Sequence, residues 1–70
     1  MTETEYLYGV QVKDFLYLPY KQAVEFKLEK GRELHRKLYG KEDTHEDRVR
    51  LHKVQKAIMH NEKLIKEWEQ

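Results

Sequence analysis

The sequence contains neither cysteine nor serine, and these absences exclude several kinds of chemistry. Without cysteine the chain can form no disulfide and lacks the commonest ligand of structural zinc. Without either residue it cannot carry a serine or cysteine catalytic triad. Its threonines are Thr2 and Thr4, close to the N-terminus, and Thr44, which an expected helix start uses. We therefore expect a protein that is not an enzyme and has no catalytic residues.

Glycine and proline are also scarce, with three glycines and one proline. The isolated glycines form no glycine-rich loop of the kind that binds phosphate groups. No apolar run approaches the roughly 20 residues that span a bilayer. The chain starts with acidic Glu3 and Glu5, whereas a signal peptide starts with basic residues. We expect a cytoplasmic protein that engages neither a membrane nor a small-molecule substrate.

Four histidines and thirteen carboxylates raise the question of a metal site. Two ligands share one helix face when they are three or four positions apart. His45, His52 and His60 are seven and eight positions apart, which is too far. Glu42 and His45 have the right spacing but lie across an expected turn. We predict no metal site and no cofactor.

The chain is small and nearly neutral, with 70 residues and a formal net charge of +1. A domain of this size buries only about 60% of the surface that its unfolded form exposes. Without disulfides or a metal, association of several copies is the remaining common route to stability. The near-neutral charge gives the whole molecule no strong attraction to nucleic acid. We expect one small domain over residues 1–70 that forms an oligomer.

The last third of the chain repeats apolar residues three and four positions apart. A helix with this heptad spacing needs a second helix to cover it. The ladder consists of Leu51, Val54, Ile58, Asn61, Ile65 and Trp68. A helix is predicted over residues 44–69, because the Thr44 hydroxyl can cap the N–H of Asp47 at its start.

Asn61 is the polar member of this ladder. An asparagine at such a position can fix register and oligomeric state by pairing with its counterpart in a second helix. Alternatively, Asn61 lies at the edge of the apolar arc and faces water. The sequence leaves both interpretations open.

A second helix is predicted over residues 19–39. Pro19 suits a first turn, and Gly40 suits the left-handed position just past a helix end. One face of this helix gathers Tyr20, Val24, Leu28, Gly31, Leu34 and Leu38. Gly31 costs about 1 kcal/mol relative to alanine, which indicates either a close approach, for example of the Trp68 or Ile58 side chain, or a local weak point.

Only a short turn separates the two helices, which favours an antiparallel helical hairpin. One hairpin alone would leave much of a wide apolar arc in water. We therefore predict a mainly α fold in which two hairpins form a homodimeric four-helix bundle.

The N-terminal arm, residues 1–18, has a different pattern. Tyr6, Tyr8, Val10 and Val12 alternate with other residues, and this period of two favours a strand. The strand must pair, either with residues 15–18 or with the same strand of a second copy. Alternatively, the arm is a strap, or Asp14 caps a helix that begins before Pro19. Phe26 points away from the main helix face, so either this arm or a partner covers it.

We expect a small non-enzymatic regulator or adaptor that binds another protein. The candidate interface residues are those of the arm, the first helix and the ladder: Tyr6, Tyr8, Tyr20, Phe26, Leu51, Val54, Ile58, Asn61, Ile65 and Trp68.

The alternative is a dimeric nucleic-acid-binding protein. The predicted helix over residues 44–69 carries a mostly basic stripe opposite the ladder, which consists of His52, Lys53, Lys56, His60, Lys63 and Lys66. In element order, a strand and two helices over residues 5–65 resemble the ribbon-helix-helix repressors. The resemblance implies a two-stranded ribbon in the major groove, with Gln11 and Lys13 as its base readers.

Overall fold

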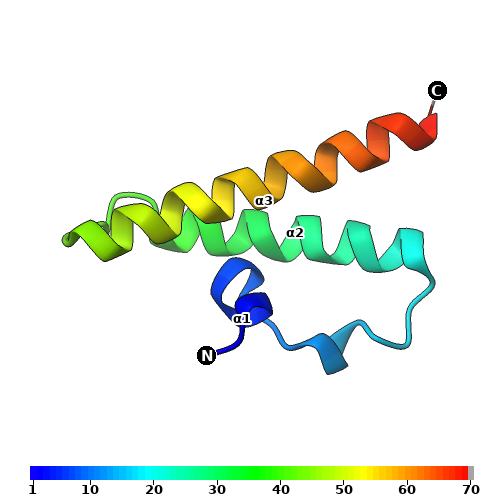
Figure 1. The fold of residues 1–70 in the computed structure, drawn as a ribbon, viewed down its shortest axis with the longest axis horizontal. Helices are drawn as coiled ribbons and strands as arrows, with labels where there is room; N and C mark the ends of the chain where they lie inside the picture. Colours follow the sequence, from blue (N-terminus) through cyan, green and yellow to red (C-terminus); the bar gives the residue numbers. More distant parts are fainter. Residues whose placement is uncertain (70) are drawn as a thin grey trace.

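The computed structural model describes residues 1–69 and is mainly helical (Figure 1). It contains α1 (Glu3–Tyr8), the short 3₁₀ helix η1 (Val12–Asp14), α2 (Tyr20–Leu38) and α3 (His45–Glu69). The prediction of a mainly α fold is confirmed. This part of the chain contains no helix with the length and hydropathy of a membrane-spanning segment.

Both ends of α2 follow from local sequence. Pro19 occupies the N-cap position, so the helix begins one residue later than predicted. Proline has no N–H to donate and a fixed φ, which suits a residue that precedes or opens a helix. Beyond the C-cap residue Tyr39, Gly40 has φ of +84°, the left-handed conformation that glycine adopts at low cost.

The start of α3 is also set locally. The backbone N–H of Asp47 donates to Thr44 Oγ1 at 3.1 Å, which is the predicted cap. Glu46 and Asp47 place carboxylates at the positive end of the helix dipole.

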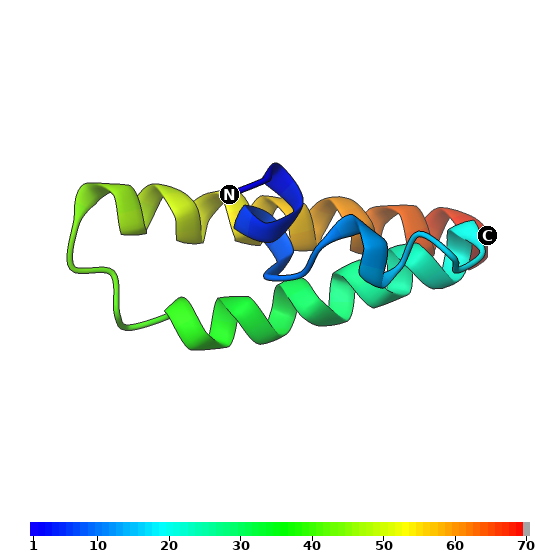
Figure 2. The same cartoon turned by 90° about the horizontal axis from the view of Figure 1, so that it is seen from below.

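The two long helices lie side by side and run in opposite directions (Figures 1 and 2). Residues 39–44 connect them at one end. At the other end, the start of α2 meets the end of α3. The short helix α1 packs against both of them, on one face of the pair.

The predicted strand in the N-terminal arm is wrong, because residues 3–8 form α1. The N–H of Glu5 donates to Thr2 Oγ1 at 3.2 Å, and Gly9 ends the helix with φ of +74°. A helix satisfies its own backbone hydrogen bonds, whereas a lone strand needs a partner. Tyr6 and Tyr8 therefore lie two positions apart on a helix, about 200° around its axis, and not on one face of a strand.

The alternative of an early helix capped by Asp14 is also wrong. The Asp14 carboxylate accepts from the N–H of Gln11 at 2.9 Å and closes the short η1 turn. Residues 15–17 then form a turn, and α2 begins only after Pro19.

The fully buried side chains come from the predicted faces of the long helices. Val24 and Leu28 of α2 are buried with Val54 of α3. Gly31 is buried among them, and a Cβ atom there would lie 3.2 Å from Ile58 Cγ1. Gly31 therefore marks a close approach of α3, one of its two predicted roles. The outer ladder residues Leu51, Ile58, Ile65 and Trp68 are half-buried.

Candidate interaction groove

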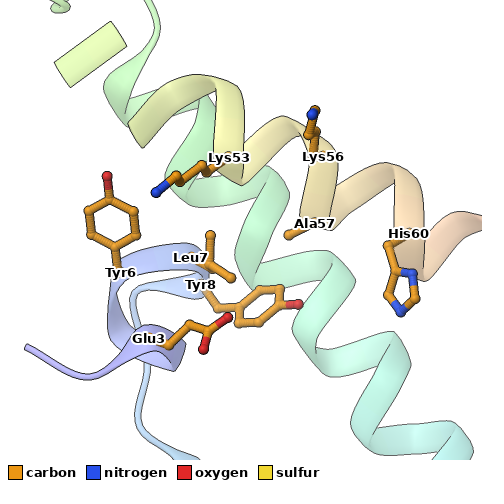
Figure 3. A pocket seen from close by; sticks show the side chains of 8 residues that line it. All are labelled: Glu3, Tyr6, Leu7, Tyr8, Lys53, Lys56, Ala57 and His60. Atoms are coloured by element: carbon orange, nitrogen blue, oxygen red, sulfur yellow. The ribbon is translucent and has the colours of Figure 1, made fainter. Parts of the chain in front are cut away.

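An open groove with a volume of ≈ 500 Å³ lies between α1 and the middle of α3 (Figure 3). We call it the α1/α3 groove. Its lining comes from both helices: Glu3, Tyr6, Leu7 and Tyr8 from α1, and Lys53, Lys56, Ala57 and His60 from α3.

Arg50 holds α1 in place beside this groove. Its Nε donates to the carbonyl of Tyr6 at 3.0 Å, and its Nη2 to the carbonyl of Glu5 at 3.5 Å. Both carbonyls belong to the last turn of α1; the Glu5 carbonyl also accepts from the N–H of Gly9 at 2.9 Å, so Arg50 adds a second donor there. The guanidinium also lies 5.1 Å from the centroid of the Tyr6 ring. One side chain of α3 therefore fixes both the backbone and an aromatic ring of α1.

Asn61 and Tyr8 form the second link. Asn61 Nδ2 donates to Tyr8 Oη at 3.2 Å and to the carbonyl of Ala57 at 2.9 Å. Asn61 is only 1% exposed, so it does not face water. Both of these partners belong to the same chain. The cost of burying a polar side chain on the ladder is thus offset without a second copy.

The groove has an apolar floor and a basic edge. Leu7, Tyr8 and Ala57 are half-buried, whereas the cations on the α3 side are exposed. Figure 3 shows Lys53 extending from α3 toward Tyr6, Lys56 directed away from α1, and Leu7 and Tyr8 coming from α1. Within residues 1–69, Lys53 and Lys56 form no salt bridge. The basic edge is therefore free to meet an acidic group.

The groove brings together residues that the sequence assigned to two different functions. Tyr6 and Tyr8 were predicted for a protein interface, and Lys53, Lys56 and His60 for nucleic acid. Three further lining residues, Glu3, Leu7 and Ala57, were not predicted. Glu3 was missed because the arm was not expected to form a helix against α3. Ala57 was missed because it is a small residue beside the ladder, and its sequence position alone does not indicate a binding role.

Other predicted interface residues lie elsewhere. Val54 and Asn61 belong to the core of the single chain. The ring of Phe26 is half-buried, with the ring of Phe15 at a centroid distance of 5.9 Å. The N-terminal arm therefore covers Phe26, one of the two alternatives that the sequence allowed.

A small aromatic patch occupies the end of the molecule where α2 begins. Tyr20 is exposed and lies edge-on to Trp68, with ring centroids 5.7 Å apart. Leu16 and Tyr17, in the turn before α2, are 73% and 78% exposed. The sequence singled out Tyr20 and Trp68, but not these two neighbours.

The remaining basic residues are exposed and lie outside the groove. His52, Lys63 and Lys66 continue the stripe along α3. Gln11 and Lys13 lie in and beside η1, and residues 1–69 contain no ribbon. The two-stranded ribbon that would carry them is therefore wrong as a prediction.

Residues 1–69 hold no group of three or more side chains placed to bind a metal ion. Comparison with known proteins gives no match: no protein-family model, no curated protein and no solved structure is similar to this chain. The geometry of the α1/α3 groove is the basis for the function proposed below.

Proposed function

We propose that this protein is a small non-enzymatic interaction module that holds a segment of a partner protein in the α1/α3 groove. The observation that carries this proposal is the groove itself, with Leu7, Tyr8 and Ala57 as its floor and exposed cations on its α3 edge. A hydrophobic groove between helices is a common receptor for a helical peptide.

The groove is supported by a fixed framework. Arg50 holds α1 to α3, and Asn61 connects the two helices through Tyr8. Because α1 is held by side chains of α3, the two walls keep their spacing before a partner arrives. A preformed site avoids part of the ordering cost of binding.

A peptide selection tests this function. Peptides from a random display library are selected on the full chain, and their affinities are measured by fluorescence anisotropy. Ala57→Phe fills the floor and is expected to weaken binding by about tenfold or more. Val12→Phe is the matched control, because Val12 is 44% exposed and lines a separate surface depression with Gln11 and Lys13.

Circular dichroism establishes that both variants keep the helical fold. Equal affinities in the two variants would contradict the groove as the binding site. Failure of the library to yield any peptide that saturates the chain would contradict the interaction function.

We propose in addition that two copies associate through the side of α2 and α3 that lies away from α1. At about 100° per residue, Met59 and Glu62 lie roughly 160° and 140° around α3 from Ala57, which lines the groove. This side carries charges of both signs, including the salt bridge from Arg32 Nη2 to Glu62 Oε2 at 2.9 Å. A surface with both signs can be self-complementary about a two-fold axis.

Sedimentation over a concentration series tests the dimer. The expected mass is twice that of one chain, and Met59→Glu is expected to reduce it to a single chain. Leu16→Glu, in the exposed turn before α2, is expected to leave the mass unchanged. A folded species with the mass of one chain at every concentration would contradict the bundle.

Binding of nucleic acid is the second candidate. It is supported by the exposure of all the basic stripe residues of α3: His52, Lys53, Lys56, His60, Lys63 and Lys66. Phosphate contacts release counterions, so binding through this stripe would weaken steeply as salt rises. Anisotropy of labelled duplex and single-stranded DNA at low and moderate salt measures the affinity and its salt dependence. No change in anisotropy on adding the protein would exclude nucleic-acid binding as the function.

A further inference from the structure

The α3 surface already carries a short helix of the same chain, α1, whose first turn is acidic. Glu3 and Glu5 lie in the first turn of α1, and Tyr6, Leu7 and Tyr8 form its second half. This helix packs on α2 and α3 within the same chain. The surface of α3 therefore already accommodates a short helix that contains both carboxylates and large apolar residues.

The basic edge of the groove extends this surface beyond α1. Lys53 and His60 are seven residues apart, or about 10 Å along the helix axis. Within residues 1–69, Lys56 takes part in no salt bridge, and Lys53 meets only the Tyr6 ring, at 5.8 Å from its centroid. Glu3 is the single carboxylate in the lining. The lining thus has a surplus of cations without acidic partners.

The lining favours a peptide over a nucleic acid. Bases would stack on an open aromatic face, but cations of Arg50 and Lys53 already lie 5.1 and 5.8 Å from the Tyr6 ring centroid. The side chains of Leu7 and Ala57 on the floor have no charge or hydrogen-bond donor for a phosphate backbone. The same floor would bury the apolar side chains of a helix.

We infer that the partner segment of the α1/α3 groove is an acidic amphipathic helix. The inference rests on the proposed function, because it names the chemistry of the ligand for the same groove. The apolar face of the helix lies on Leu7, Tyr8 and Ala57, and its carboxylates face Lys53 and Lys56. The charges select the partner and its orientation, and the floor supplies most of the affinity.

Two matched peptides test this inference. Each is a labelled helical peptide of about 12 residues, or 18 Å of helix. Both carry leucine at i, i+3, i+4 and i+7. One has glutamate and the other has lysine at the remaining positions. The acidic peptide is expected to bind the full chain about tenfold more tightly than the basic one, with the difference shrinking as salt rises.

Charge reversal in the protein localises the effect. The double variant K53E/K56E is expected to bind the acidic peptide more weakly than the original protein does, and the basic peptide more tightly. K63E/K66E changes the same number of charges on exposed residues of α3 outside the groove lining, and it is expected to keep the original preference. Circular dichroism establishes that both variants fold.

Each other outcome overturns the inference in a distinguishable way. If both peptides bind equally and Ala57→Phe weakens both, the inference of an acidic partner is wrong. The proposed interaction function of the groove would still hold. If neither peptide binds, the acidic partner is wrong, and the library selection decides the function independently. If single-stranded DNA binds and both double variants reduce its affinity equally, the basic stripe binds nucleic acid instead.

Discussion

The hydroxyl of Tyr8 accepts a hydrogen bond from the side-chain amide of Asn61 at 3.2 Å, across 53 positions of sequence. This contact places the buried polar group of α3 against the last residue of α1. It also replaces the pairing between two copies that an asparagine on a heptad ladder suggests. Together with the hydrogen bonds from Arg50 to the carbonyls of α1, it holds α1 beside the α1/α3 groove.

Tyr8→Phe removes this hydroxyl and keeps the ring. The free energy of unfolding is expected to fall by about 1–2 kcal/mol, because a buried amide N–H loses its partner. Urea denaturation followed by circular dichroism measures the change. Tyr17→Phe serves as the control, since Tyr17 is exposed, and it is expected to leave stability unchanged. Equal stabilities of all three proteins would mean that the Tyr8 bond contributes nothing.

Asn61→Leu is expected to couple with Tyr8→Phe. Each single change leaves one polar group without its partner, whereas the double change removes both groups. The double variant should therefore be less destabilised than the sum of the single variants, by about 1 kcal/mol. The same unfolding measurement on the four proteins gives this coupling energy, and strict additivity would contradict it.

The oligomeric state of Asn61→Leu provides a separate prediction. Because Asn61 finds both of its partners within the chain, its replacement is expected to leave the molar mass unchanged. Sedimentation measures this mass. A shift to another oligomer would show that Asn61 sets register between copies, as its place on the ladder first suggested.

Gly31→Val is expected to destabilise the fold by about 1–3 kcal/mol, because the added side chain overpacks the contact with Ile58. A Cβ alone would lie 3.2 Å from Ile58 Cγ1 and 3.5 Å from Tyr8 Cδ1. Glu29→Val provides the comparison, since Glu29 is exposed on the same helix and measures the propensity of valine alone. Gly31→Val as stable as the original protein would show that Ile58 can move away.

Arg50→Met keeps an apolar stem but removes the donors to the carbonyls of α1. The amide hydrogens of α1 are expected to exchange faster, because the helix loses a link to α3. Amide hydrogen exchange measured by NMR reports this residue by residue, with the middle of α2 as an internal reference. The affinity of Arg50→Met for a peptide selected on the groove should also be lower than that of the original protein. Unchanged exchange at the N–H of Gly9, which donates to the Glu5 carbonyl, would contradict this role.

Much of the fold could be predicted from local sequence. Pro19, Gly40 and Thr44 mark helix ends through φ preferences and a single cap hydrogen bond, which involve only residues close in sequence. The spacing of Val24, Leu28 and Val54 identified buried positions for the same reason. The predictions for the two long helices were therefore correct within one residue at these ends.

The arm could not be predicted in the same way. The alternation of Tyr6 and Tyr8 fits a strand, but a strand must pair with a second strand. Within residues 1–69 the arm packs against helices, which offer no such pairing. The Arg50 bonds and the Asn61 contact instead stabilise a six-residue helix that is too short to be stable by itself.

The sequence by itself determined the long helices, their caps and their apolar faces, because these depend on backbone geometry and on periodicity. Only the tertiary structure decided the conformation of α1, the partners of Asn61 and the lining of the groove. Those features arise from contacts between residues far apart in the chain, such as Tyr8 with Asn61 and Tyr6 with Arg50. Such contacts are set by how the helices pack, and no local pattern encodes them.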